Sequence, residues 1–405
     1  MVQPKFRLGL TLVVLAAVLG WAGSSWAAVP QTPGPLDPEF LPQNVLGAFK
    51  PVGARATALG GAFVSLADDA SGGAWNPAGV ALGRGFDLGL SFTGYSDNLN
   101  VENIRDFYQD LTDLREDITD QSRQAKAFNT FLNLIEESGG RVVQVGISPL
   151  FSLSLGRRLA VNGYGQIDGL LRMTSTRTPV AGTNNETVNI SVHAAAVTLG
   201  YASVSWAQPF GDNLIVGLSG KYLRADYFPG RFDMEATRDQ TTGIVDVATL
   251  NHNLDPNSRR NLRSNDTAIA FDVGLLLRNG HTTVGAVVRN LNSPTLTFEN
   301  PNAGAGTFDV GLDPQLDVGF SLRSEDGRHR VAFEIHNLSA SNAAPTKVHF
   351  GYEGQYWWRH LTLRFGINGT ELVGGLGVNL AGFYLDLTSG TNLREFLACG
   401  LRLAF

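Results

Sequence analysis

Histidines, carboxylates and cysteines are the side chains from which a catalytic or metal site is most often built, and their spacing in this chain favours neither kind of site. The seven histidines are scattered and the only cysteine is Cys399, so we expect no metal site and no internal disulfide. Glu334 and His349 fall where two neighbouring strands would place a carboxylate opposite a base. No Gly-x-Ser-x-Gly sequence and no second acid accompany them. We therefore expect an ion pair between strands, no enzymatic activity and no cofactor.

A second set of chemically capable residues lies in a short stretch rich in glycine and alanine, Gly53 to Gly79. Small side chains allow a backbone to lie close against a wall of other atoms. Arg55, Asp68 and Asp69 bring charge into this stretch, and charges in an enclosed space pair with partners of opposite sign. The site residues that we select here are Gly53, Arg55, Gly60, Gly61, Asp68, Asp69, Asn76, Pro77, Ala78 and Gly79.

The elements that must position these residues are β-strands. From Phe86 to the end of the chain, apolar and polar residues alternate with a period of two, which is the pattern of a strand with one apolar face. The candidate strands lie near residues 85–95, 141–154, 158–173, 188–207, 213–225, 266–278, 282–290, 315–323, 329–337, 346–356, 359–367, 371–379, 382–388 and 394–405. These fourteen segments predict an all-β fold, and their even number places both ends of the ladder on one side.

The connections between the predicted strands alternate in length. Short ones lie at residues 156–158, 209–212, 279–281, 324–327 and 355–358, and long ones at residues 96–140, 174–187, 226–265 and 291–314. This alternation is typical of a bacterial membrane barrel, whose polar strand faces line the lumen. A soluble β-sandwich shows the same alternation of residues and is the alternative. Near Ala195 the apolar face changes sides, which predicts a β-bulge or a kink within the strand at 188–207.

Both ends of the chain carry features of export and insertion. Residues 1–27 combine Lys5 and Arg7 with an apolar run and a small-residue cleavage site, which predicts a signal peptide. The last predicted strand ends in Phe405 and resembles the signal by which the barrel-assembly machinery recognises outer-membrane barrels. The net charge of −6 argues against a nucleic-acid partner. No apolar run after the N-terminus is long enough for a membrane-spanning helix.

The connection at residues 96–140 is the one region with helical periodicity. Residues Val101 to Ser138 predict two helices, broken near residues 119–123. The apolar residues that we select on these helices are Phe107, Leu111, Leu114, Phe128 and Phe131. Two interpretations stay open: this face receives a hydrophobic ligand at the outer mouth of the barrel, or it packs on the barrel rim.

The glycine-rich stretch also carries a family resemblance. The segments Gly53-Ala54-Arg55-Ala56, Leu59-Gly60-Gly61-Ala62, Ala67-Asp68-Asp69 and Asn76-Pro77-Ala78-Gly79 follow one another in a characteristic order. They resemble the N-terminal plug of outer-membrane barrels in the long-chain fatty-acid transporter (FadL) superfamily, which includes PorV-like and TraF-like members.

This resemblance implies an antiparallel transmembrane barrel of fourteen strands in a Gram-negative outer membrane. Residues 1–27 would be the signal peptide, residues 28–84 the tether and lumen plug, and residues 85–405 the barrel, with 96–140 as a helical extracellular loop. The family implies passive uptake of hydrophobic molecules such as long-chain fatty acids or hydrocarbons, with membrane lipid, the ligand and the barrel-assembly machinery as partners. PorV-like and TraF-like members imply the alternative, a partner of other envelope proteins in secretion or assembly that transports nothing.

Overall fold

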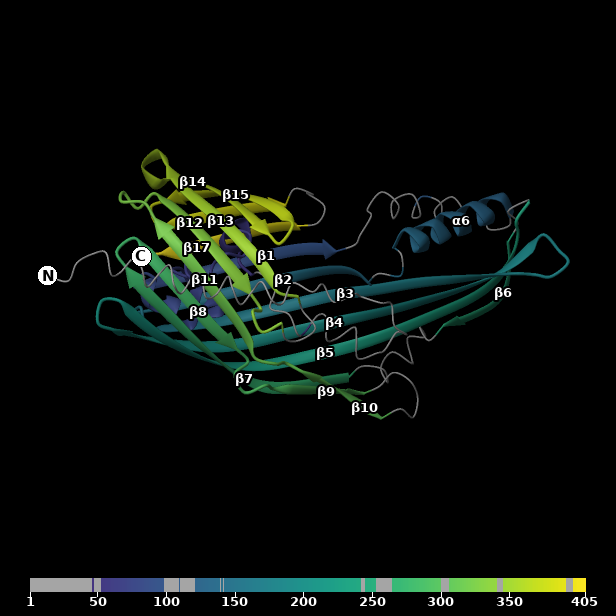
Figure 1. The fold of residues 1–405 in the computed structure, drawn as a ribbon, viewed down its shortest axis with the longest axis horizontal. Helices are drawn as coiled ribbons and strands as arrows, with labels where there is room; N and C mark the ends of the chain where they lie inside the picture. Colours follow the sequence, from purple (N-terminus) through teal and green to yellow (C-terminus); the bar gives the residue numbers. More distant parts are fainter. Residues whose placement is uncertain are drawn as a thin grey trace. The chain divides into compact units, whose positions relative to one another are not determined.

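The computed structural model describes residues 46, 52–97, 109, 121–138, 140, 142–241, 245–252, 264–299, 306–340, 345–390 and 396–405. The predicted signal peptide lies outside these residues, as does all but Leu46 of the predicted tether up to residue 51. Strands dominate the described part of the chain (Figure 1). The strands are β1 (Phe86–Asp97), β2 (Val142–Leu155), β3 (Leu159–Pro179), β4 (Asn185–Phe210), β5 (Leu214–Asp239), β6 (Val245–His252), β7 (Ser264–Asn279), β8 (Thr282–Arg289), β9 (Thr295–Glu299), β10 (Thr307–Gly311), β11 (Gln315–Arg323), β12 (His329–His336), β13 (Lys347–Tyr356), β14 (Leu361–Asn368), β15 (Glu371–Leu380), β16 (Phe383–Gly390) and β17 (Phe396–Ala404). The helices are α3 (Ala54–Ala58), α4 (Gly72–Trp75), α6 (Gln121–Ser138), and the 3-10 turns η1 (Pro77–Leu82) and η2 (Trp357–Arg359).

Fourteen of these strands form one closed antiparallel sheet. Each strand pairs with the next barrel strand along the chain, β4 pairs with β5, and β17 pairs with β1. Closure gives each barrel strand a neighbour on both sides, so most of its backbone polar groups are satisfied within the sheet. Strand β6 adds to β5 outside this ring, and β9 and β10 form a separate hairpin. The prediction of a fourteen-stranded antiparallel barrel is confirmed.

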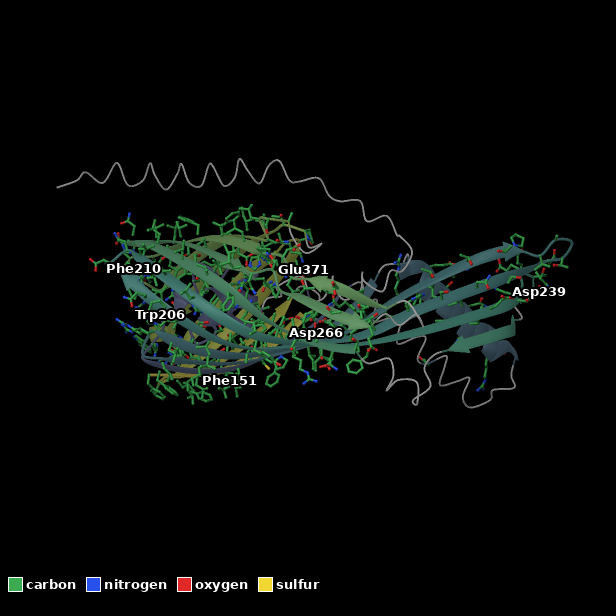
Figure 2. The ribbon with its side chains drawn as sticks, turned by 90° about the horizontal axis from the view of Figure 1, so that it is seen from below. Phe151, Trp206, Phe210, Asp239, Asp266 and Glu371 are labelled. Atoms are coloured by element: carbon green, nitrogen blue, oxygen red, sulfur yellow. The ribbon has the colours of Figure 1, made fainter. Side chains whose placement is uncertain are left out.

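The two faces of the barrel wall differ in polarity. Large apolar side chains alternate outward along the strands, and Phe151, Trp206 and Phe210 are 41%, 42% and 56% exposed (Figure 2). The opposite face carries buried charged groups, among them Asp317 and Glu353. A soluble β-sandwich buries its apolar faces instead, so this distribution excludes that alternative.

The barrel has two unlike ends. One end, which we call the base, carries the first and last barrel residues, and the amide nitrogens and carbonyl oxygens of Phe86 and Phe405 bond each other at 3.2 and 2.9 Å. The short turns 156–158, 211–213, 280–281, 324–328, 357–360 and 381–382 lie at the base. We call the other end the mouth, and there β3, β4 and β5 continue beyond their neighbours (Figure 1).

The long strands at the mouth correct two sequence predictions. Strands β3, β4 and β5 contain 21, 26 and 26 residues, whereas a transmembrane strand needs about 9–11. Residues 174–187 and much of 226–265 were predicted as loops, but Thr178 pairs with Thr187 and the turn is only 180–184. Both faces are largely polar here, so the sequence does not alternate, and backbone pairing alone reveals the strands.

The bulge predicted near Ala195 is wrong. Strand β4 pairs with both β3 and β5 through Ala195 without a register shift. The buried face changes because different elements cover the two sides. Val188 and Ile190 pack against α6, whereas Ala195 and Val197 on the other face pack against the β9–β10 hairpin and its neighbours. Within the described ranges, no helix combines the length and the apolar character needed to cross a bilayer.

Candidate functional site

The segment from residue 52 to residue 84, which we call the N-terminal segment, lies against the polar face of the barrel wall. Its contacts reach strands around the whole ring. The amide nitrogen of Ala54 donates to Ser91 of β1, and Thr388 of β16 donates to the Ala54 carbonyl. Near the other end of the segment, η1 packs on β4, β5 and β7. The segment therefore spans the cross-section of the barrel.

Glycines on the wall face the backbone of the N-terminal segment. A Cβ atom added to Gly351 would lie 2.7 Å from the carbonyl oxygen of Leu59, and one added to Gly285 would lie 2.8 Å from that of Val64. Added Cβ atoms would also collide with the segment at Gly217, Gly274 and Gly366. Sequence reasoning singled out only the glycines of the segment. The wall glycines could have been found from the sequence as well, because a glycine on the polar face of a predicted strand often marks a place where another backbone comes close.

Gly60 and Gly61 form the tightest bend of the segment. Their φ angles are +65° and +86°, values that a side chain disfavours. Gly60 also lies directly against the Ile367 backbone, where a Cβ would come within 2.5 Å of the carbonyl oxygen. Gly53 likewise has a positive φ of 90°, just before α3. Each of these positions therefore requires glycine for a backbone reason.

Arg55 connects the N-terminal segment to the wall through a buried ionic cluster. Its guanidinium donates to both Glu353 carboxylate oxygens at 2.8 and 3.1 Å, and to Asp68 at 2.6 Å. Glu353 also accepts a hydrogen bond from Arg364 at 2.8 Å, and Asp68 accepts one from Arg330 at 2.6 Å. Burial raises the pKa of Asp68, but Arg330 and Arg55 outweigh it and hold the pKa well below its usual range. Asp68 is therefore ionised when the segment is in place.

Asp69 belongs to a neighbouring ionic group. It accepts a hydrogen bond from Arg55 at 3.0 Å and lies 3.3 Å from Arg402 of the terminal strand. Arg402 in turn lies 3.7 Å from Asp87, which accepts from the Ala70 amide at 3.1 Å. The two acidic residues singled out from the sequence thus contact arginines on different parts of the wall.

Asn76 and Pro77 form a hydrogen-bonded corner. The Asn76 side chain accepts from the Ala78 amide at 3.0 Å, which begins η1, and donates to the carbonyls of Val64 and Leu275 at 3.1 and 3.2 Å. Gly79 lies so close to Ala67 that a Cβ there would collide with it. Arg289 of β8 donates to the carbonyls just before this corner, those of Ala74 and Trp75, at 2.8 and 2.7 Å. Arg289 lies in the strand predicted at residues 282–290, and the sequence alone gives it no partner in the segment.

Glu334 and His349 occupy directly opposite positions on β12 and β13. Each also contacts the N-terminal segment: Glu334 accepts from the Val64 amide at 2.6 Å, and His349 Nδ1 lies 2.5 Å from the Gly60 carbonyl oxygen. The expected ion pair between the two strands is wrong, because Glu334 pairs with His336 on its own strand while both residues hold the N-terminal segment. Among the described residues, no group of histidine, cysteine and carboxylate side chains is arranged to hold a metal ion.

A cluster of packed apolar side chains lies between the N-terminal segment and the mouth. It contains Leu170, Val197, Leu223 and Tyr227 on β3, β4 and β5, and the β9–β10 hairpin packs against them with residues such as Phe298. Tyr201 packs against this apolar cluster and also against the apolar core of the N-terminal segment. Tyr201 therefore joins the two apolar regions. Sequence reasoning missed this cluster because its residues come from six strands, β3, β4, β5, β7, β9 and β10.

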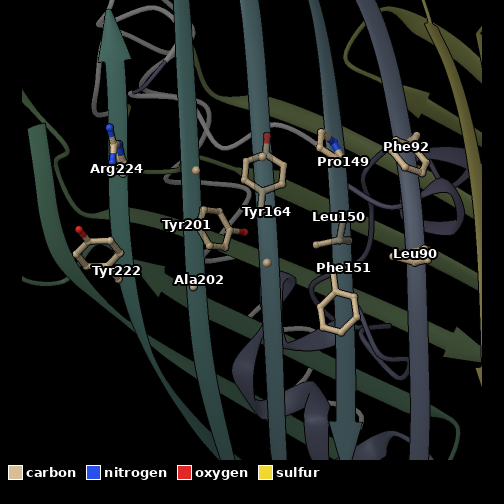
Figure 3. Close-up of a pocket in the computed structure, with 13 residues that line it drawn as sticks. Leu90, Phe92, Pro149, Leu150, Phe151, Tyr164, Tyr201, Ala202, Tyr222 and Arg224 are labelled. Atoms are coloured by element: carbon tan, nitrogen blue, oxygen red, sulfur yellow. The ribbon is translucent and has the colours of Figure 1, made fainter. Parts of the chain in front are cut away.

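The ladder between β2 and β3 is interrupted beside Tyr164 and Tyr201. Pairing of β2 with β3 stops after Ile147 and resumes at Leu150, so Pro149 and Gly165 are not ladder partners. Proline lacks the amide hydrogen that the ladder needs there. An apolar groove of about 400 Å³ opens to the outside at this level, and the Tyr164 and Tyr201 rings, 4.8 Å apart, close its inner end (Figure 3).

The remaining predicted site residues lie elsewhere. Phe107, Leu111 and Leu114 fall outside the described residues, as does the side chain of Phe131. Phe128 is buried in a cluster formed by α6 with β3, β4 and β5, so this residue packs on the sheet. Phe405 is 70% exposed at the base.

Comparisons with known proteins agree with this architecture. A sequence profile of the family described as "F plasmid transfer operon, TraF, protein" matches residues 73–334. No curated protein matches the chain. A ΔS2S3 mutant of the monoaromatic hydrocarbon channel TodX is 11% identical, with 87% of this chain and 99% of that chain covered, at a TM-score of 0.51. The P. putida toluene transporter TodX is 12% identical, with 88% of this chain and 99% of that chain covered, at a TM-score of 0.47. At 11% identity, the match to the mutant channel shows a shared fold alone.

Proposed function

This chain belongs to the family described as "F plasmid transfer operon, TraF, protein", and we propose that it is an outer-membrane β-barrel channel for passive uptake of hydrophobic small molecules. The apolar outward faces of the strands suit lipid contact, because a closed barrel satisfies its backbone internally. We place the base towards the periplasm, since barrels of this kind have their short turns on that side. Long-chain fatty acids and hydrocarbons are the proposed substrate class.

In this proposal the N-terminal segment is the plug. A barrel of fourteen strands is wide enough to leak small solutes when its lumen is empty. The ionic cluster around Arg55, the wall glycines and the Asn76 corner together favour a seated position that blocks this leak. The Asn76 side chain donates hydrogen bonds to the carbonyls of Val64 and Leu275, and Pro77 restricts the backbone. The corner would therefore move as a unit.

The observation that carries the proposal is the wall interruption at Pro149 and Gly165. Beside it, Tyr201 and Tyr164 separate an apolar cluster on the lumen side from the apolar groove on the outside. A hydrophobic molecule that passed from this cluster to the groove would contact mainly apolar side chains, so desolvation would oppose its passage little. We propose that movement of the two tyrosine rings lets it leave sideways into the lipid.

Uptake of a labelled fatty acid or hydrocarbon by liposomes containing the pure protein tests this route. Gly165→Leu should fill the groove and slow uptake severalfold. Gly169→Leu is the matched control, because Gly169 lies on the same face of β3 where pairing with Val145 is continuous. Absence of uptake for every hydrophobic ligand, or equal rates in both variants, would contradict the route. Deletion of residues 28–80, with the signal kept, should leave an assembled barrel that conducts ions in planar bilayers.

The second candidate function is that of a partner in envelope assembly or secretion. The family match and the platform at the mouth, where α6 covers one face of β3, β4 and β5, favour it. Such a platform lies well beyond the membrane-spanning length of the strands and suits contact with another protein. Pull-down of envelope proteins by the intact chain, lost on deletion of residues 121–138 while liposome uptake is absent, would favour this function.

A further inference from the structure

The turn between β13 and β14 at the base exposes two tryptophans. Trp357 and Trp358 are 76% and 84% exposed, more than any other large apolar side chain in the described part of the chain. Tryptophan is seldom so exposed to water, because its ring is large and mostly apolar. The pair therefore indicates a contact that the isolated chain does not supply.

The backbone of this turn is also unusual. Trp357, Trp358 and Arg359 have φ angles of +46°, +50° and +73° in succession. Glycine or asparagine would adopt this left-handed conformation at lower cost. The other described turns at the base consist of glycine with polar, charged or small residues: Gly156-Arg157-Arg158, Gly211-Asp212-Asn213, Gly280-His281, Ser324-Glu325-Asp326-Gly327-Arg328 and Ala381-Gly382. Two tryptophans held in a strained turn point to a function for the rings.

The turn continues an aromatic group on the outward face of the barrel. The hydroxyl groups of Tyr352 and Tyr356 lie 3.3 Å apart, and His329 Nδ1 lies 2.8 Å from the Tyr352 hydroxyl. Rings that are apolar in body and polar at one end favour the boundary between lipid and water. Cationic groups adjoin the turn, since Arg359 donates to the Asp326 carbonyl at 3.1 Å in the neighbouring turn, where Arg328 is half exposed.

We propose that the Trp357–Trp358 turn is a membrane anchor that inserts both indole rings into the headgroup layer of the leaflet at the base. Its ligand is phospholipid: the rings occupy the boundary region, and Arg328 and Arg359 lie beside lipid phosphates. The inference rests on the proposed membrane location of the barrel. The anchor holds this side of the barrel at a set depth, where the strand ends alone would not.

Tryptophan fluorescence tests the anchor with an internal control. The variant Trp206→Phe keeps the turn tryptophans, and the double variant Trp357→Phe with Trp358→Phe keeps Trp206 on the outward face of β4. Both are prepared without the predicted signal peptide 1–27, which holds Trp21 and Trp26, and both retain Trp75, which is fully buried and contributes a constant signal. Each protein is reconstituted in phosphatidylcholine and phosphatidylglycerol vesicles that carry bromine at shallow or deep acyl positions, and iodide is the aqueous quencher.

Shallow bromine should quench the turn tryptophans about twofold more than deep bromine does, with little quenching by iodide. Quenching of Trp206 by brominated lipid, together with turn tryptophans that respond to iodide alone, would overturn the anchor and leave the barrel in the membrane. If brominated lipid quenched neither protein, both the anchor and the proposed membrane location would be overturned.

Discussion

Replacement of Arg55 by alanine should release the N-terminal segment without unfolding the barrel. Arg55 is the one residue of the segment that bonds both Glu353 on the wall and the acidic pair beside it. Removal of one member of a buried ion pair costs about 3–5 kcal/mol because its partners lose their counter-charge. Glu353 would still pair with Arg364 at 2.8 Å and Asp68 with Arg330 at 2.6 Å. Because neither carboxylate loses all of its counter-charge, we expect the lower end of this range, about 3 kcal/mol.

A cost of about 3 kcal/mol corresponds to about a 10²-fold rise in the open fraction, at 1.36 kcal/mol for each factor of ten. The variant Ala70→Cys, made together with Cys399→Ser, reports the open fraction, because Ala70 is almost fully buried while the segment is seated. Its labelling rate with a membrane-impermeant maleimide is proportional to the open fraction when closing is fast. We expect labelling to accelerate about 10²-fold in Arg55→Ala.

The matched control is Arg328→Ala, which removes an arginine whose partner Asp326 lies 3.8 Å away in an exposed turn. Exposed pairs of this kind contribute little, so its labelling rate should match the parent's. Labelling of Arg55→Ala at the parent's rate would show that the cluster does not hold the segment. A double variant with Glu353→Gln should open less than the two single effects together predict, because both changes remove the same contact.

Three further predictions concern pH, backbone contact and lipid exposure. Because Arg330 and Arg55 lower the pKa of Asp68 below its ordinary value of 3.8 despite its burial, its contribution to seating is present above that value and is lost as pH falls through the lowered pKa. Ion conductance in planar bilayers, which unlike maleimide labelling does not depend on thiolate formation, should therefore not rise through neutral and mildly acidic pH and should rise only below 3.8. A rise near pH 6 would contradict this. Gly366→Val should prevent seating and raise ion conductance in planar bilayers, because its side chain would occupy the place of the segment's backbone. Phe365→Arg should reduce insertion into membranes, at about 2–4 kcal/mol for an arginine facing lipid near the midplane, and normal insertion would argue against lipid on that face.

Several features of this protein were readable from local sequence. Strand identity follows from alternation with a period of two, and this pattern depends only on which face each residue occupies. The fourteen strands were therefore predicted within a few residues, apart from the extensions of β3, β4 and β5. Arg55, Asp68 and Asp69 were recognised as charges that need partners, because an enclosed charge without one is costly.

Tertiary structure alone decided the partners and the openings. Glu353, Arg330 and Arg402 are far from the segment in sequence, so only the closed sheet specifies which charge they meet. The register of β2 with β3 decides that Pro149 falls opposite Gly165, and the apolar cluster exists because four barrel strands and a hairpin meet there. The apparent bulge at Ala195 arises in the same way, since α6 and the hairpin cover opposite faces of one regular strand. Local alternation reports which residues are apolar, but only packing between distant elements determines what covers them.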